Sequence, residues 1–218
     1  MNTWKAGAMS ALLGALLFGC EDRNPPAVSE GATGPDAATG ISAKTAGSSS
    51  DHIRWDIISV INFAPLTLGP GGVAFALAPN DLTIKLTGSG TFVAPASGGA
   101  SGAATGGGTW ETFSGGVSTG SGTYAVTGFT SWEFANFQAP GAVDLIGDTN
   151  ERANGNAVLR IEYSDGSLGT LGIGCHGPGA PDGIVEGVIA TKGYVTYWAA
   201  EAPAPGVDKD RTLFHIEK

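Results

Sequence analysis

Glycine recurs along almost the whole chain, and this excludes most helical folds. The 218 residues include 36 glycines and 12 prolines. A glycine in a helix interior costs about 1 kcal/mol relative to alanine, so long helices cannot persist at this density. After Ser50, only the stretch from Ile184 to Ala190 is compatible with a helix as well as with a strand. The composition therefore predicts an all-β protein.

Alternating apolar and polar residues predict several strands. Ile53, Trp55 and Ile57 alternate with Arg54 and Asp56, which places the two groups on opposite faces of one strand. We expect such a strand to be buried on its apolar face only. The same alternation occurs at 82–86, 158–163 and 213–217, and turn-forming residues at 80–81, 164–167 and 192–193 interrupt these runs.

A short motif, Gly-x-Gly-Thr-aromatic, occurs at 88–92, 106–110 and 120–124. We expect each copy to enter a strand through its flexible glycines and to anchor that strand on the core through its aromatic residue. Glycine-rich loops also bind phosphate, but they do so at the N-terminus of a helix, and no helix is predicted after any copy. The stretch from Ala94 to Thr105, mostly Ala, Gly and Ser, is expected to be a hairpin loop.

Residues 51–218 have the size of one domain. Roughly ten short strands in such a domain predict a single antiparallel β-barrel of calycin-like size. We expect the strand around Trp55 to pair with the strand around Phe214, because this pairing would remove both edges of the sheet. A two-sheet jelly-roll sandwich is the alternative. A small barrel is either filled by side chains or encloses one apolar ligand.

The start of the chain has the pattern of an export signal. Lys5 precedes an apolar run over 6–18, shorter than the ~20 residues that span a membrane as a helix, and the run ends in Leu17-Phe18-Gly19-Cys20. This ending resembles the lipobox of bacterial lipoproteins. The resemblance implies that residues 1–19 are a cleaved signal peptide and that Cys20 carries a diacylglycerol and an N-terminal acyl chain such as palmitate. An ordinary secreted protein is the alternative.

Residues 20–50 are expected to be a disordered tether that follows the lipid. Val28 and Ile41 are their only sizeable apolar residues, too few to offset the entropy lost on ordering. A coil of this length reaches about 30 Å. Glu21, rather than Asp, follows the cysteine, and in the lipoprotein class this favours the outer membrane of a Gram-negative cell envelope. The lipid is the only membrane contact that we predict.

The chain is acidic, which bears on its partners. Its formal charge of −9 becomes −10 once Lys5 leaves with the signal peptide. An acidic surface repels polyanions, and Lys and Arg form no stripe, so we expect no binding to nucleic acid. The sequence contains no motif for a cofactor, and we expect none.

Cys175 and His176 are the first candidates for chemistry. If Cys20 carries lipid, Cys175 has no disulfide partner in the chain, and neighbouring Cys and His are typical of thiolate nucleophiles. Adjacent strand residues face opposite sides, so these two side chains can meet only in a turn, which the nearby glycines and Pro178 favour. A buried, unreactive cysteine is the commoner case, and we favour it.

One carboxylate and one polar loop are further candidates. Glu133 follows Trp132, and a carboxyl beside an aromatic ring can act as an acid because its pKa is raised. On a strand, however, Glu133 would face away from Trp132 and toward solvent. Asp148, Asn150 and Asn154 offer oxygen ligands for Ca²⁺. They lack the spacing of an EF-hand, so an ordinary polar connection is favoured over a metal site.

Pairing of the first and last strands would gather five polar residues. They are His52, Arg54, Asp56, His215 and Glu217. Such a group can form an acid/base site, but a solvent-exposed outer face is the commoner arrangement. No spacing such as His-x-x-x-His supports a metal site there.

Three functions are compatible with these observations. We favour a noncatalytic, lipid-anchored barrel that binds a small apolar ligand or another envelope component. The second is an enzyme, such as a cyclase, isomerase or hydrolase, that acts through Cys175 and His176 or through a buried carboxylate such as Glu133. The third is a passive structural module of the cell surface.

Replacing Cys20 with Ser tests the anchor. We expect the Cys20→Ser protein to lose acylation and to move from the membrane to the soluble fraction, because the lipid supplies the membrane affinity. Its thermal unfolding should match that of the wild type. Loss of the fold in this variant would contradict the assignment of Cys20 as a lipid carrier.

Overall fold

The computed structural model describes residues 51–94, 103–199 and 208–217, and this part of the chain is all-β. None of these residues forms a helix long and apolar enough to cross a membrane. Of the stretch from Ile184 to Ala190, which the sequence left open between helix and strand, residues 187–190 belong to strand β11 (Gly187–Lys192). The elements are β1 (Asp51–Phe63), β2 (Leu66–Pro70), β3 (Ala74–Ala78), β4 (Leu82–Leu86), β5 (Ser89–Ala94), β6 (Ala104–Ser114), β7 (Val117–Phe137), β8 (Val143–Asp144), a 3₁₀ turn η1 (Thr149–Glu151), β9 (Arg152–Tyr163), β10 (Leu168–Cys175), β11 (Gly187–Lys192), β12 (Val195–Ala199) and β13 (Arg211–Glu217).

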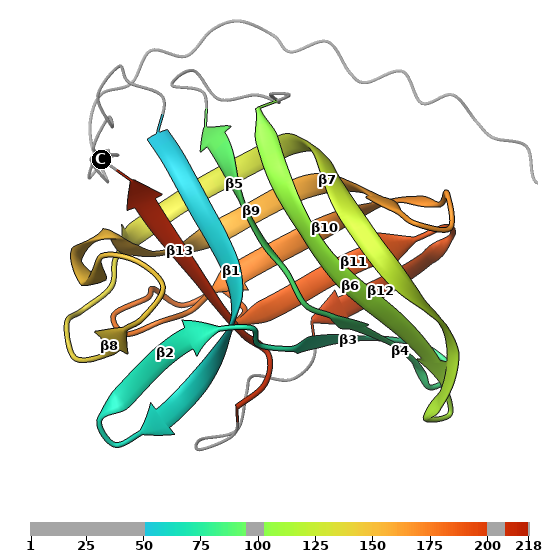
Figure 1. Cartoon of the computed structure of the whole chain (residues 1–218), viewed down its shortest axis with the longest axis horizontal. Coiled ribbons are helices and arrows are strands. Elements are labelled where there is room, and N and C mark those ends of the chain that lie inside the picture. Colours follow the sequence, from blue (N-terminus) through green and yellow to red (C-terminus); the bar gives the residue numbers. More distant parts are fainter. Residues whose placement is uncertain (1–50, 95–102, 200–207, 218) are drawn as a thin grey trace, which may run out of the picture. The chain divides into compact units, whose positions relative to one another are not determined.

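The strands form one sheet whose hydrogen-bonded order returns to its starting strand. Antiparallel pairs lead from β10 through β11, β12, β3, β4 and β6 to β7, and both β7 and β10 pair with β9. A second closed path runs from β1 through β5, β6, β7, β9 and β13 back to β1. In Figure 1, β6 and β7 cross in front of the more distant β9 to β12. The only parallel pair among the described strands is β2 with β8.

The first and last described strands pair, as the sequence predicted. β1 and β13 run antiparallel from His52 opposite Glu217 to Ile58 opposite Arg211. Figure 1 shows the two strands crossing the sheet side by side. β1 also pairs with β5 on its other side, so residues 52–56 in its first half have strand partners along both edges.

Aromatic rings fill the centre of the core. Phe92 stacks on Phe129 with a centroid distance of 5.0 Å. The Trp132 ring meets Phe92 and Phe214 edge to face, at 5.8 and 4.6 Å. Trp55 is fully buried in the same core. Burial of each such side chain contributes about 1.5–3 kcal/mol, so these rings dominate the packing energy.

The aromatic residues of the three Gly-x-Gly-Thr-aromatic motifs, Phe92, Trp110 and Tyr124, are all buried, as predicted. Only the first copy enters a strand through its glycines, because the second and third copies lie inside β6 and β7. Two of the motif glycines, Gly90 of β5 and Gly106 of β6, allow these two strands to approach each other closely. Gly106 of β6 has a φ of +110°, and a Cβ on it would overlap the backbone of β5 at Ser89 and Gly90. Ala104 and Thr105, which were expected in a loop, already belong to β6, and residues 95–102 lie outside the described part of the chain.

Alanine substitutions at two glycines distinguish the free-energy cost of a strained backbone angle from the cost of steric overlap. Gly116 has a φ of +80° with open space around its Cβ position. Gly116→Ala is therefore expected to cost about 1 kcal/mol of unfolding free energy through its backbone angle alone. Gly106→Ala should cost about 3 kcal/mol because it adds overlap with β5. Urea unfolding measures both, and equal losses would contradict the close crossing.

Candidate functional site

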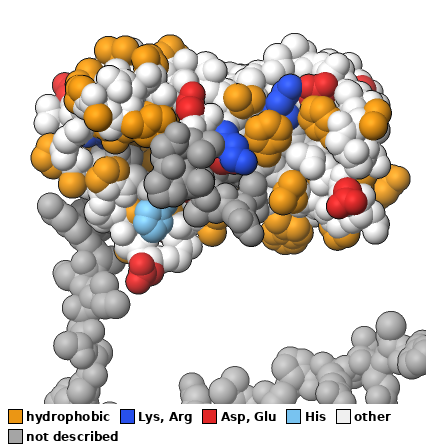
Figure 2. All heavy atoms as spheres, turned by 90° about the horizontal axis from the view of Figure 1, so that it is seen from below, with side chains coloured by type: hydrophobic (Ala, Val, Ile, Leu, Met, Phe, Trp, Pro, Cys, Tyr) orange, Lys and Arg blue, Asp and Glu red, His pale blue; other side chains and the backbone are white. Residues whose placement is uncertain are grey.

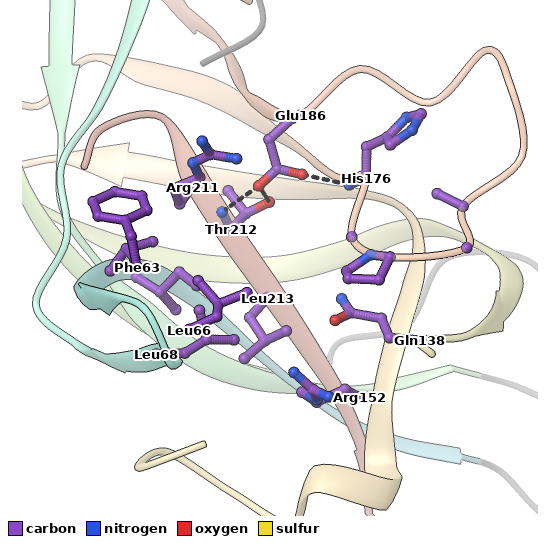
Figure 3. Close-up of a pocket in the computed structure, with 16 residues that line it drawn as sticks. Phe63, Leu66, Leu68, Gln138, Arg152, His176, Glu186, Arg211, Thr212 and Leu213 are labelled. Atoms are coloured by element: carbon purple, nitrogen blue, oxygen red, sulfur yellow. Dashed lines mark hydrogen bonds between the residues drawn. The ribbon is translucent and has the colours of Figure 1, made fainter. Parts of the chain in front are cut away.

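A pocket of about 570 Å³ lies between the hairpin of β1 and β2 and the loop that follows β10. β1 pairs with β13 only as far as Ile58. Beyond that residue, β1 extends past β13 and pairs with β2 in a hairpin. This overhang supplies an apolar wall, which Figure 3 shows opposite Gln138 and His176. The volume lies within the range of small-molecule sites. The apolar wall consists of Ile58, Val60, Phe63, Leu66, Leu68 and Leu213.

The opposite wall is the loop that begins at His176, and hydrogen bonds fix its position. The Gly177 amide donates to Asn154 Oδ1 at 2.8 Å, and Asn136 Nδ2 donates to the Gly179 carbonyl at 2.6 Å. A Cβ on Gly177 would overlap the amide of Gln138. The loop thus lies directly against the side-chain amide of Gln138, which also lines the pocket.

Glu186 holds two sides of the pocket together. Its carboxylate accepts hydrogen bonds from the Thr212 amide at 2.8 Å and from the His176 amide, as Figure 3 shows. Burial raises the pKa of Glu186 to about 7, although these hydrogen bonds and the nearby Arg211 act in the opposite direction. The carboxyl can thus gain or lose a proton near neutral pH.

The structure gives Cys175 and His176 separate partners. Cys175 is buried, and its thiol lies 3.3 Å from the Thr212 carbonyl and 3.2 Å from Gln138 Nε2. Burial raises the pKa of this thiol, which disfavours the nucleophilic thiolate. His176 Nδ1 contacts the Ile184 carbonyl at 2.8 Å instead. His176 lines the pocket, whereas Cys175 lies behind the lining.

Glu133 is exposed on β7, while its neighbour Trp132 packs against Phe92 and Phe214. The two side chains therefore face opposite sides of the strand, and Glu133 is not part of the pocket.

The three oxygen-bearing residues proposed for Ca²⁺ have other partners. Asp148 caps η1 by accepting from the Asn150 amide at 2.8 Å and from Asn150 Nδ2 at 3.0 Å. Asn154 is buried and supports the pocket loop through Gly177. In the parts of the chain described here, no group of three or more His, Cys, Asp or Glu side chains is placed to hold a metal ion.

The polar residues of β1 and β13 form an outer face that is solvated only in part. Asp56 and His215 are buried, and the segment that contains β8 lies against His215 and Arg54. Asp144 of this segment lies 2.9 Å from His215 Nε2 through its Oδ2 atom. Gly147 passes so close that a Cβ on it would lie 2.7 Å from the His215 ring. The alternation of apolar and polar residues identified the polar face of β1 and β13 correctly. A segment distant in sequence, which contains β8, lies against part of this face.

Two members of this polar group, Arg54 and Asp56, pair along β1, and two others, His52 and Glu217, are exposed. Arg54 donates to Asp56 through two nitrogens at 2.8 and 2.9 Å, and this contact raises the pKa of Arg54. His52 is exposed opposite Glu217 at the end of the ladder. The buried members are therefore Asp56 and His215, with the Asp144 side chain from the covering segment, and the half-buried Arg54 pairs with Asp56.

Arg152 joins this buried group to the pocket. It is 1% exposed, and its Nε lies 3.3 Å from the Thr149 carbonyl and 3.9 Å from Asp144 Oδ2. Its two terminal nitrogens are buried without a hydrogen-bond partner among the described residues. Arg152 lines the pocket, and Figure 3 shows it at the end opposite Glu186.

Sequence reasoning missed Glu186, Arg152 and Gln138. Each stands at or just outside the end of a strand, where alternation carries no information about burial. The only signal was the presence of polar or charged residues beside strand ends, which is common in surface loops.

Comparison of the chain with protein-family models, with curated protein sequences and with solved structures found no match. On the face seen in Figure 2, hydrophobic side chains lie scattered among a few side chains of either charge.

The raised pKa of Glu186 predicts a pH dependence of stability. Between about pH 4 and pH 7 the folded protein keeps a proton that the unfolded chain has released. The free energy of unfolding should therefore fall by about 3 kcal/mol as the pH rises through this window. Glu186→Gln should flatten this decline, as measured by urea unfolding at several pH values.

The exposed Glu133 supplies the matched control for that measurement. Glu133→Gln should leave the decline as steep as in the wild type. An equally steep decline in the Glu186→Gln protein would contradict the role of the Glu186 carboxyl.

Proposed function

We propose that residues 51–218 form a single β-barrel that binds a small, largely apolar ligand in the pocket described above, without converting it. We further propose that lipid on Cys20 holds the chain in the bacterial cell envelope. The closed paths of strand pairing support a barrel rather than a two-sheet sandwich. The sequence Leu17-Phe18-Gly19-Cys20 supports the anchor.

The observation that carries the ligand-binding proposal is the apolar wall of the pocket. Six side chains from β1, β2 and β13 form it, while loop backbone and a few polar groups face them. Phe63 remains 43% exposed, so part of this wall contacts water when no ligand covers it. Burial of apolar area contributes about 25 cal/mol per Å², which makes a hydrocarbon ligand a favourable cover. The buried aromatic core lies elsewhere, so the ligand would bind between hairpin and loop.

A partner protein of the envelope is a second kind of ligand for this module. Trp198 and Leu77 face each other across β12 and β3 and are 61% and 48% exposed. Large apolar side chains on adjacent strands are suited to contact another protein.

Enzymatic activity is the second candidate function, and Glu186 favours it. A buried carboxyl that titrates near pH 7 and lines a pocket can act as a general acid or base. Arg211 lies in the same lining and could stabilise negative charge in a bound substrate. Such an enzyme would work through Glu186 rather than through Cys175, because the Cys175 thiol lies behind the lining.

An uncharged fluorescent probe, N-phenyl-1-naphthylamine, tests apolar binding. We expect it to bind the wild type with enhanced emission, and Val60→Trp to weaken binding at least about tenfold by filling the pocket. Ile61→Trp is the matched control, because Ile61 is the next residue on β1 and is 60% exposed. The proposal fails if the probe does not bind the wild type, or if both variants bind it equally while remaining folded.

A further inference from the structure

We propose that the ligand of this pocket carries a single negative charge, in the form of a carboxylate, and that the guanidinium of Arg152 binds it. This inference rests on the proposed ligand-binding function. It adds the chemical class of the ligand and the orientation in which it lies, namely an apolar carboxylic acid with its head group beside Arg152.

The first observation is the unfilled hydrogen-bonding capacity of Arg152. A guanidinium has five N–H donors, and buried polar groups in proteins nearly always have partners. Here only Nε has one, the Thr149 carbonyl at 3.3 Å. The two terminal nitrogens are buried at the end of the pocket and bond to none of the residues that the structure describes. Two parallel N–H groups match the two oxygens of a carboxylate.

The second observation is the balance of charge around Arg152. Asp144 is the acidic residue that the structure pairs with it, but the Oδ2 to Nε distance is 3.9 Å. The same Oδ2 atom is 2.9 Å from His215, and the Asp144 Oδ1 atom accepts from the Ile146 amide. Asp56, the next buried carboxylate, is bound to Arg54. The terminal nitrogens of Arg152, a residue that lines the pocket, therefore have no bonded counter-charge among the described residues.

The charge balance also limits the ligand to one negative charge. A dianion such as a phosphate monoester would bring a second negative charge near the buried Asp144. A monoanion brings one negative charge to the guanidinium and is repelled less by Asp144 than a dianion is. The carboxylate therefore fits better than a phosphate.

The walls of the pocket set the orientation of the rest of the ligand. Leu68 and Leu213 lie beside Arg152 in Figure 3, and Phe63 lies farther along the same wall. Glu186 stands at the opposite end, where a carboxylate would be repelled whenever Glu186 is ionised. The head group therefore lies at the Arg152 end, and the hydrocarbon chain extends along the apolar wall.

Displacement of N-phenyl-1-naphthylamine by octanoate and by 1-octanol tests the inference on the full-length protein. The two compounds have the same chain length and differ in charge. Octanoate should displace the probe from the wild type at a concentration at least about tenfold lower than octanol, because a charge-assisted pair contributes about that much. Equal displacement by the two compounds would overturn the inference while leaving apolar binding intact. Failure of the probe to bind would instead overturn the proposed function.

Variants of Arg152 locate the selectivity. Arg152→Gln should abolish the preference for octanoate, and Arg152→Lys should reduce it, because an ammonium keeps the charge but lacks the planar pair of donors. Arg160→Gln is the matched control, since Arg160 lies on the same strand but is exposed. It should keep the full preference. Circular dichroism checks that each variant is folded, and the wild-type comparison decides the inference even if Arg152→Gln does not fold.

Discussion

The pairing of β1 with β13 is the constraint on which the rest of the structure depends. It joins the two ends of the described chain, places Trp55 opposite Phe214 in the core, and completes a closed path of strand pairs. β1 is the longer of the two strands. Its first part is fixed between β13 and β5, and its second part overhangs to form the hairpin with β2. The overhang forms one side of the pocket, and the apolar wall combines side chains of β1 and β2 with Leu213 of β13.

The polar interior is concentrated near the pocket, whereas the aromatic core is apolar. Asp144, His215 and Arg152 are buried together on one side, and Glu186 is buried on another. Buried charges are costly unless they are paired, so a fold keeps them where they serve a specific contact. Glu186 meets this condition through its bonds to Thr212 and His176. Arg152 is only partly paired, because its two terminal nitrogens have no bonded partner among the described residues. This difference from Glu186 is the reason why we propose a negatively charged ligand.

Much of the strand content could be predicted from the sequence, but the candidate site could not. The alternation around Ile53, Leu82, Val158 and Leu213 corresponds to strands β1, β4, β9 and β13, because a two-residue period is a local property. The burial of Asp56 and His215 was not predictable in this way. It depends on a segment some ninety residues beyond β1 in sequence, and local periodicity contains no information about such a cover. Glu186 and Arg152 were missed for the same reason.

The burial of Cys175 has a kinetic consequence. Its sulfur lies against the Thr212 carbonyl and the Gln138 amide, and both of these residues line the pocket. A reagent in solution reaches the thiol only after this end of β10 separates from β13. The rate of thiol modification therefore measures how often the strands around the pocket open, and any ligand that bridges the two walls slows that rate. The modification rate of Cys175, the single cysteine among the described residues, thus reports how often the structure opens locally at the pocket.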